Sequence, residues 1–386
     1  MDKIKESIAQ VFEEISQGLV SGGFGKRTRV ALTLAGSEHG EDEMLRGAEL
    51  AQAGDPSIEV VVIGQKTRSN LMLIEADCQK TAHETMDKML LDGELDAAVT
   101  MHYNFPIGVA TVGKVTTPGL GADMLLATTT GTSATNRAEA MVRNAIAGII
   151  TAKALGNESP SVGILNVDGA NLVERSLRKL NENGAGIRFS ESVRADGGAI
   201  MRGNDLLAGS VDVMVTDTLT GNILVKTLSA FTTGGSYEAT GCGYGPGIGE
   251  NYQRLVLILS RASGLPVVAN SLKYAAQLAK GGLTAVARKE FARFSKCGLA
   301  DVCLGLRKSG AASADAQPNK AIPAKEVVTA ELLGIDIMEL ENAASLLMES
   351  GIYAESGMGC TGPVVLVSEA NAAKASDVLT KAGYIS

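Results

Sequence analysis

The sequence contains no tryptophan and few other aromatic residues. Seven tyrosines and seven phenylalanines in 386 residues cannot supply the series of stacking surfaces that single-stranded nucleic acid needs. The net charge of -8 at pH 7 also disfavours a nucleic-acid partner, because nucleic acids are themselves anionic. No uninterrupted apolar run approaches the roughly 20 residues that span a bilayer, and the charged N-terminus lacks the apolar stretch of an export signal. We therefore expect neither a nucleic-acid partner nor a membrane span.

Histidine and cysteine are scarce as well, with three and five residues. No two cysteines have the CxxC spacing or another spacing typical of zinc ligands, so we expect no metal. The absence of a GxSxG motif argues against a serine hydrolase. Nothing in the sequence indicates a redox cofactor site, and we expect no cofactor. Five scattered thiols without an export signal fit a reducing cytoplasm.

Predicted strands and helices alternate along most of the chain. Glycine, with 45 residues, supplies the many turns that such alternation needs. The predicted strands, which are continuously apolar, cover residues 29–34, 59–63, 97–101, 161–166, 211–215 and 266–270. The predicted helices cover residues 3–20, 41–53, 81–92, 136–154, 172–183 and a segment from 223. This pattern predicts an α/β fold whose mostly parallel sheet has helices on both faces.

Composition changes divide the chain into four segments. Residues 1–27 hold the N-terminal amphipathic helix, and residues 28–307 hold the α/β body. Residues 308–324 are small, polar and turn-rich, which indicates a linker or a surface loop. Residues 325–386 form a small tail with a predicted helix over 336–350, a strand over 364–368 and a helix over 371–382. A tail this short has little core of its own, so we expect it to dock on the carboxyl-end rim of the main sheet.

Cys360 is the first candidate for a catalytic residue. It lies between Gly359 and the pair Thr361 and Gly362, directly before the apolar run of the last predicted strand. Glycines let a substrate approach closely, and a thiolate at the mouth of a strand could attack a carbonyl. The backbone N–H groups of Gly359, Thr361 and Gly362 are candidates to stabilise the oxyanion that forms. The alternative is a buried cysteine that only fills space.

The other thiols have weaker cases. Cys242 is the main rival, because it also lies in an open glycine-rich segment. We expect Cys78 to be half-buried in a helix and Cys303 to belong to the core. The segment 241–249 itself, with five glycines, predicts a lid, a loop or an anion cradle before a helix that begins near residue 250.

Polar clusters follow several predicted strands, at the edge where parallel sheets bind their ligands. The candidate phosphate- or acyl-binding residues in these clusters are Asp217, Thr218, Asn222, Lys226, Asn171, Ser37 and His39. A lysine and backbone N–H groups at a helix start could hold a phosphate or an acyl oxygen. The alternative in each cluster is an ordinary capped helix with a solvated lysine or an acidic first turn.

Two runs of sequence resemble the phosphate acyltransferases of phospholipid synthesis (PlsX type). They are the run 209–227, which includes Asp217, Asn222 and Lys226, and the run 163–171. The resemblance covers roughly residues 28–305 and implies a three-layer α/β fold like that of isopropylmalate dehydrogenase and phosphotransacetylase. It also implies an enzyme that converts an acyl thioester and inorganic phosphate into an acyl phosphate. Residues 34–40 match the family's Gly-Gly-Asp-His pattern only loosely, which weakens a role for Ser37 or His39.

The tail motif that contains Cys360 lies outside that resemblance. Nearly end to end, the chain is similar to the alpha subunits of component C of the glycine/sarcosine/betaine reductase complex, found in amino-acid-fermenting anaerobes. In that family a cysteine of this motif carries an acetyl thioester, and its position matches Cys360. The resemblance implies a beta partner subunit, a selenoprotein that delivers a carboxymethyl group on selenium, and inorganic phosphate that releases acetyl phosphate. Two alternatives remain open: an ordinary phosphate acyltransferase in which Cys360 is structural, and a non-catalytic scaffold subunit.

Overall fold

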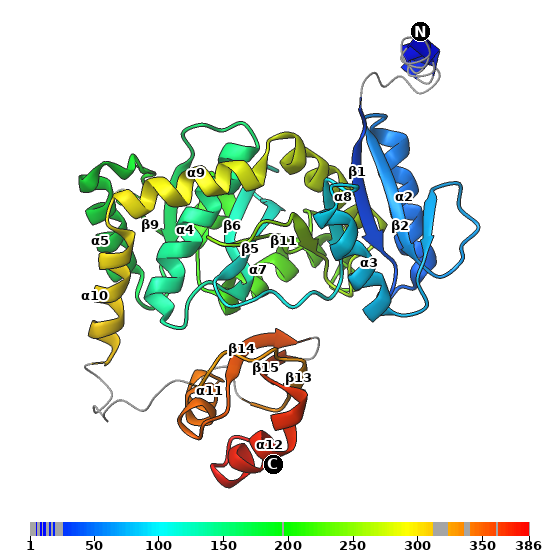
Figure 1. Cartoon of the computed structure of the whole chain (residues 1–386). Helices are drawn as coiled ribbons and strands as arrows, with labels where there is room; N and C mark the ends of the chain where they lie inside the picture. The colour runs from blue at the N-terminus through cyan, green and yellow to red at the C-terminus, as the bar shows by residue number, and fades with distance from the viewer. Residues whose placement is uncertain are drawn as a thin grey trace.

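The main feature of the fold is a 12-stranded sheet (Figure 1). The computed structural model describes residues 26–194, 197–311, 323–335, 340–359 and 362–385, together with single positions between residues 5 and 19. The sheet order is β3-β2-β1-β4-β12-β11-β5-β6-β10-β7-β8, with β9 beside β7. The strands are β1 (Thr28–Thr33), β2 (Ile58–Gly64), β3 (Met72–Glu75), β4 (Ala97–Thr100), β5 (Val109–Thr116), β6 (Asp123–Thr132), β7 (Ser161–Leu165), β8 (Arg188–Phe189), β9 (Ile200–Met201), β10 (Val213–Val215), β11 (Gly245–Ile248) and β12 (Val256–Ile258).

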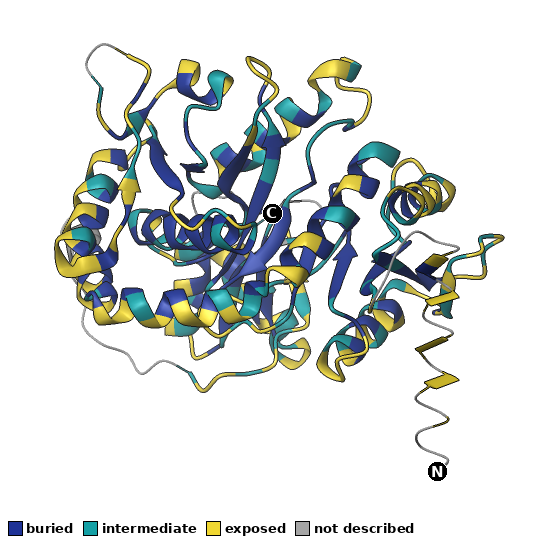
Figure 2. Cartoon of the chain, turned by 90° about the horizontal axis from the view of Figure 1, so that it is seen from above, coloured by how far each residue is buried: buried dark blue, intermediate teal, exposed yellow. Residues whose placement is uncertain are grey.

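The two wings of this sheet are parallel, and its centre is antiparallel. β1, β2, β3, β4 and β12 pair in parallel in one wing, and β6, β7, β8, β9 and β10 do so in the other. In the centre, β5 runs antiparallel to β6 and β11, and β11 runs antiparallel to β12. The strands are buried between helices on both faces (Figure 2). The expected α/β fold with a mostly parallel sheet is therefore confirmed.

Helices cover both faces of the sheet. They are α2 (Glu41–Gly54), α3 (Gln79–Leu91), α4 (Arg137–Ala154), α5 (Ala170–Leu180), α6 (Gly203–Ala208), α7 (Thr218–Ala230), α8 (Leu265–Lys280), α9 (Leu283–Lys296) and α10 (Leu299–Ala311). Helix α4 is buried around most of its surface, because it packs between the sheet strands β6 and β10 and the helices α5 and α9. Helix α10 continues to Ala311, past the predicted start of the linker at residue 308.

Two sequence-based predictions in this body are wrong. The predicted strand over 266–270 is the first part of α8, in which Pro266 occupies the first turn. Proline fits the first turn of a helix because the N–H that it lacks would have no intrahelical acceptor there. An apolar run alone does not distinguish a buried helix from a buried strand. The predicted lid over 241–249 and its following helix are also absent from the described chain. Instead Gly245–Ile248 is the buried central strand β11, and residues 251–255 lead directly to β12.

Glycine is required in β11 by close packing. A Cβ at Gly247 would lie 2.4 Å from the ring of Phe105, and Gly245 has a φ of 85° with the carbonyl oxygen of Val112 1.9 Å from a Cβ position. The glycines thus mark tight approach between strands in the sheet centre, and not the flexible segment that their number predicted.

The tail folds around a small core of its own. Its sheet is antiparallel in the order β13 (Ala330–Leu332), β15 (Gly362–Val367), β14 (Ala354–Gly359). The helices α11 (Leu340–Glu349) and α12 (Ala372–Lys381) pack on it, and Val365, Val367, Leu347 and Leu379 are fully buried between them. The hairpin β14–β15 lies beneath the main sheet in Figure 1, toward the end of β6.

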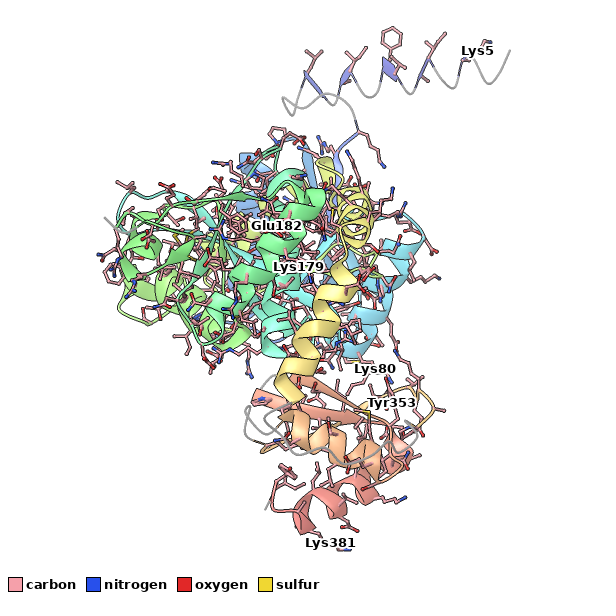
Figure 3. All side chains as sticks on the ribbon, turned by 90° about the vertical axis from the view of Figure 1, so that its left-hand side faces the viewer. Lys5, Lys80, Lys179, Glu182, Tyr353 and Lys381 are labelled. Carbon is pink, nitrogen blue, oxygen red and sulfur yellow. The ribbon has the colours of Figure 1, made fainter. Side chains whose placement is uncertain are left out.

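The described positions between residues 5 and 19 are helical, as the sequence predicts. Their apolar side chains, Ile8, Val11, Phe12, Ile15 and Leu19, are all exposed. Lys5 in this segment and Lys381 at the end of α12 lie at opposite ends of the molecule (Figure 3). Throughout the described ranges, helices are too short or too polar to cross a bilayer.

Candidate functional site

A pocket of about 360 Å³ lies where strand ends of the main sheet meet the tail. Its walls come from the segment after β4, the end of β6, the segment after β12, helix α7 and the hairpin β14–β15. The side chains and backbone on the main-sheet side include His102, Tyr103, Asn104, Thr130, Gly131, Thr132, Asn222, Lys226, Tyr244, Ser260 and Arg261. The tail contributes Ser356, Gly357, Gly359 and Leu366. The site is therefore built jointly by the α/β body and the tail, at the edge of the sheet where α/β proteins bind ligands.

Helix α7 carries Asn222 and Lys226 to the pocket wall. Its first turn is capped by Asp217, whose carboxylate accepts a hydrogen bond from the backbone N–H of Thr220 at 3.1 Å. The Asn222 amide donates to the carbonyl oxygen of Thr129 in β6 at 3.0 Å, and the Thr218 hydroxyl donates to that of Gly131 at 3.0 Å. These bonds tie the start of α7 to the end of β6, so that Lys226, one turn on, faces the pocket.

The pocket has a positive character near α7. Burial lowers the pKa of Lys226, but the nearby Tyr244, Glu238 and Glu38 raise it by more, so the pKa lies above its ordinary value. The Lys226 ammonium also lies 6.0 Å from the centre of the Tyr244 ring. Lys226 is therefore a cation at neutral pH, and Arg261 adds a second cation to the pocket lining. Glu38 offsets Arg261 only in part, since the two charged groups are 3.6 Å apart and half-exposed.

The structure separates the predicted site residues into three groups. Asn222, Lys226 and Gly359 line the pocket together. Asp217 and Thr218 support its wall. The Asp217 carboxylate also pairs with Arg137 at 3.1 Å. Burial raises the pKa of Asp217, but its bonds to Thr220 and Arg137 lower it by more, so the pKa lies below its ordinary value. The Asp217 carboxylate therefore acts as the cap of α7. Because it is negatively charged, it does not itself bind an anion.

The remaining predicted residues lie outside the pocket wall. The Ser37 hydroxyl accepts a bond from the His39 backbone N–H at 3.1 Å, and the His39 ring lies 3.2 Å from the carbonyl oxygen of Ala262. Both therefore shape the turn that presents Glu38 at the rim. Asn171 is exposed near the start of α5, away from the residues that line the pocket.

Cys360 and Thr361 lie outside the described residues. Their neighbours are described: β14 ends at Gly359, β15 begins at Gly362, and these two glycines are paired across the hairpin. Gly359 lines the pocket. In the sequence, Cys360 directly follows this residue of the pocket wall.

The other cysteines differ sharply in exposure. Cys242 is 5% exposed, and burial raises the pKa of its thiol to about 12, so the expectation of an open, reactive thiol there is wrong. Burial likewise raises the pKa of Cys303 to about 11, and Cys297 is buried. Cys78 is exposed at the start of α3, where hydrogen bonds between its thiol and Thr81 lower its pKa, in contrast to the half-buried filler that the sequence predicts.

Sequence reasoning missed several pocket residues, among them His102, Tyr244 and Arg261. His102 and Arg261 follow β4 and β12, two neighbouring strands that the sequence did not place side by side. A search for polar residues directly after every apolar strand would have found His102, because the predicted strand over 97–101 ends beside it.

Comparison with known proteins then places the chain. It is 52% identical over 385 residues, 100% of both chains, to the glycine/sarcosine/betaine reductase complex component C subunit alpha of Peptoclostridium acidaminophilum. The chain belongs to this family of alpha subunits. A sequence model of the family described as "Fatty acid synthesis protein" also matches residues 28–366. That match continues through β14 into β15, beyond the limit near residue 305 expected for the phosphate acyltransferase resemblance, and includes Cys360.

More distant relatives of this chain are phosphate acyltransferases. The enzyme of Thermotoga petrophila is 28% identical over 238 residues, which cover 52% of this chain and 68% of that one. The enzyme of Thermotoga maritima is 29% identical over 236 residues with the same coverage. Among solved structures, a branched-chain phosphotransacylase from Enterococcus faecalis V583 has a TM-score of 0.48 at 16% identity, over 65% of this chain and 99% of that chain.

Proposed function

We propose that this alpha subunit carries an acetyl group as a thioester on Cys360 and transfers it to inorganic phosphate, which forms acetyl phosphate. The observation that carries the proposal is that Gly359, the residue before Cys360, lines one pocket with Lys226 and Asn222. The relatives support both halves of it. One is a reductase subunit similar over its full length, and others are phosphate acyltransferases, of which one matches 52% of this chain.

The phosphate would bind between α7 and the tail hairpin. Lys226 supplies a permanent positive charge, and Arg261, which also lines the pocket, supplies a second, bidentate donor. The hydroxyl groups of Thr130, Thr132 and Ser260 can complete the hydrogen bonds of the anion. Asn222 is already bonded to Thr129, and its role is to hold this wall in place and to offer its second N–H.

Transfer of the acetyl group follows from these positions. A phosphate oxygen attacks the thioester carbonyl and forms the new C–O bond, and the C–S bond then breaks and leaves the electron pair on the sulfur of Cys360. The negative charge that develops on the carbonyl oxygen needs fixed donors, for which the backbone N–H groups of Gly359, Thr361 and Gly362 are the candidates. Docking of the tail over the pocket keeps water from competing with phosphate for the thioester.

Loading of Cys360 is assigned to the partners. A selenoprotein would deliver a carboxymethyl group, and a beta subunit would complete component C; both assignments come from the family. Conversion of the carboxymethyl carbon to a methyl group adds two electrons, which the selenium atom supplies as it is oxidised. The alpha chain therefore needs no redox cofactor in this scheme, and its five cysteines fit the cytoplasm, where we place the complex.

The test runs the transfer backwards on the purified chain. Incubation with acetyl phosphate should place one acetyl group on the chain, and peptide mapping should assign it to Cys360. The variant Cys360→Ser should not form the thioester, whereas Cys78→Ser, which removes the exposed thiol of α3, should be labelled as well as the unmodified chain. Label on Cys242 or no label would contradict the nucleophile assignment. Phosphate-dependent acyl transfer that survives in Cys360→Ser would favour direct transfer, and absence of any acyl transfer would favour a scaffold subunit.

A further inference from the structure

A single carboxylate lies in the lining of the pocket that we assign to phosphate. Among the described residues that line this pocket, Glu38 is the only acidic one, and it shares the lining with the cations Lys226 and Arg261. The scheme above gives Glu38 no role, and a negative charge beside a bound anion by itself weakens binding. Its position therefore calls for a chemical function other than attracting the charge of the ligand.

The turn that carries Glu38 is bonded to the turn that carries Arg261. The backbone N–H of Glu38 donates to the carbonyl oxygen of Arg261 at 2.9 Å, and the His39 ring lies 3.2 Å from the carbonyl oxygen of Ala262. The helices that follow the two turns, α2 and α8, pack against each other. The main chains of Glu38 and Arg261 are therefore held side by side at the rim of the pocket.

The turn of Arg261 is also fixed from its other side, by Glu238. The backbone N–H of Glu238 donates to the carbonyl oxygen of Ala262 at 2.9 Å, and the N–H of Gly264 donates to that of Glu238 at 2.9 Å. The Ser263 hydroxyl donates to the buried Glu238 carboxylate at 3.1 Å. With its backbone fixed on both sides, Arg261 can adjust to a ligand only through its side chain.

The charged groups of Arg261 and Glu38 are close to each other without a hydrogen bond between them. The Nε atom of Arg261 lies 3.6 Å from Oε1 of Glu38, and the two side chains are 45% and 54% exposed. An N–H···O hydrogen bond is about 2.7–3.2 Å long, so Glu38 does not occupy the N–H donors of the guanidinium. An anion that accepts from these donors would lie directly beside the Glu38 carboxylate.

A carboxylate in this place distinguishes anions by whether they carry a proton. An ionised carboxylate can only accept hydrogen bonds. Inorganic phosphate retains a P–O–H group at neutral pH and can donate to it, whereas sulfate is fully ionised and has no proton to donate. With phosphate, the hydrogen bond offsets the repulsion between the two negative groups; with sulfate, the repulsion remains and nothing offsets it.

We propose that Glu38 makes this pocket select phosphate over sulfate, by accepting a hydrogen bond from the P–O–H group while Lys226 and Arg261 bind the ionised oxygens. The inference rests on the proposed function, which takes the anion of the pocket to be phosphate. It adds an orientation to that scheme: the protonated oxygen is held at Glu38, so that an ionised oxygen is left to attack the thioester. At Glu38 itself no bond is made or broken, and the proton stays on phosphate.

The experiment measures the binding of two anions to the full chain without any acyl chemistry. Isothermal titration calorimetry at pH 7 and constant ionic strength compares inorganic phosphate with sulfate. The parent chain should bind phosphate more tightly. The amide of Glu38→Gln can donate as well as accept and can therefore bond either anion. We expect this variant to bind sulfate more tightly than the parent does, and its phosphate-to-sulfate ratio of affinities to fall about tenfold or more.

Three further measurements control for charge, place and anion chemistry. Glu41→Gln removes the same charge from an exposed position of α2 outside the pocket lining, and its ratio should equal that of the parent. Lys226→Ala should weaken the binding of both anions, which assigns the binding to this pocket. Arsenate also carries a proton at neutral pH, so its affinity should follow that of phosphate in every variant.

The outcomes separate this inference from the function on which it rests. If the parent shows no preference, or if Glu38→Gln changes the affinities for both anions by the same factor, Glu38 does not read the proton and the inference fails, whereas the phosphate site stands. If the parent binds neither anion, or if Lys226→Ala binds both as the parent does, the phosphate site of the proposed function fails, and the inference fails with it.

Discussion

Gly221 in α7 lies directly against the backbone of Thr128 in β6. A Cβ at Gly221 would be 1.7 Å from the Thr128 carbonyl oxygen and 2.8 Å from its carbonyl carbon. This approach allows the start of α7 to meet the end of β6, where the next residue, Asn222, bonds Thr129. One glycine thus sets the distance between the sheet and the helix that carries Lys226.

We predict that Gly221→Ala destabilises the chain by about 1–3 kcal/mol, because the methyl group forces α7 away from β6. It should also reduce phosphate use, since Asn222 and Lys226 move with the helix. Gly203→Ala is the matched control: it lies at the start of α6, with nothing within 4 Å of its Cβ position. Urea denaturation should show a lower midpoint only for Gly221→Ala. Equal midpoints for the two variants would mean that the contact with Thr128 relaxes at no cost.

Removal of Lys226 should weaken phosphate use more than acyl-enzyme formation. Loss of one charge-assisted contact costs about 1.5–3 kcal/mol, or about tenfold or more in the phosphate-dependent rate. Asn222→Ala should act in the same direction, because it removes the hydrogen bond from the Asn222 amide to the Thr129 carbonyl oxygen. The measurement is the rate of acetyl phosphate formation against phosphate concentration, with Lys296→Ala, an exposed lysine at the end of α9, as the control. A phosphate dependence that does not change in Lys226→Ala would exclude the residue from the site.

A chain truncated after Ala311 should remain folded, whereas one truncated after Gly305 should be less stable. The reason is Arg307, which bonds both carboxylate oxygens of Glu139 in α4 at 2.6 Å, while the Glu139 side chain is 1% exposed. Without Arg307 the buried carboxylate keeps its pair with Arg143 but loses both bonds to Arg307, and a lost hydrogen bond to a charged group costs about 1.5–3 kcal/mol. Both truncations should lose all transfer that depends on Cys360. Arg307→Ala in the full chain isolates the contact, and Arg46→Ala, an exposed partner of Glu43, should change stability by less than about 1 kcal/mol.

The same contact predicts a pH dependence. Burial raises the pKa of Glu139, but its bonds to Arg307 and Arg143 lower it by more, so the folded-state pKa lies below the ordinary 4.5. The stabilisation is then fully present above that value and is lost as the pH falls through the lowered pKa. The free energies of unfolding of the parent and of Arg307→Ala should therefore converge in acid and differ most at neutral pH. A difference that stays constant from neutral pH into acid would show that Arg307 acts through packing alone.

Alkylation at neutral pH should label Cys78 and leave Cys242, Cys297 and Cys303 unmodified in the folded chain. Cys78 is exposed, and the hydroxyl and backbone of Thr81 lower its pKa, whereas burial raises the pKa of Cys242 to about 12 and that of Cys303 to about 11. Thr81→Ala should slow labelling of Cys78, because the thiolate loses its hydrogen bond from the Thr81 hydroxyl. Mass spectrometry after brief treatment with iodoacetamide gives the order. Early label on Cys242 would indicate that the sheet centre opens under the conditions used.

The sequence by itself determined the α/β alternation, the mostly parallel sheet and the position of Lys226 and Asn222 after a strand. These are local properties: apolar strands, glycine turns and capped helix starts act over a few residues. The sequence-based prediction was wrong at 266–270 and at 241–249. A buried helix has the same composition as the predicted strand in the first segment, and a glycine-rich central strand has the same composition as the predicted lid in the second. In both places, contacts between distant segments decide the conformation.

Only the tertiary structure decided which of the candidate residues share a pocket. It brings Gly359, Asn222 and Lys226 together with His102 and Arg261, which come from strand ends that are far apart in the chain. It also buries Cys242 in the sheet and exposes Cys78, because burial depends on which strands become neighbours. The sequence carries no local signal for the pairing of β12 with β4 or of β11 with β5, since these contacts link residues more than 100 positions apart.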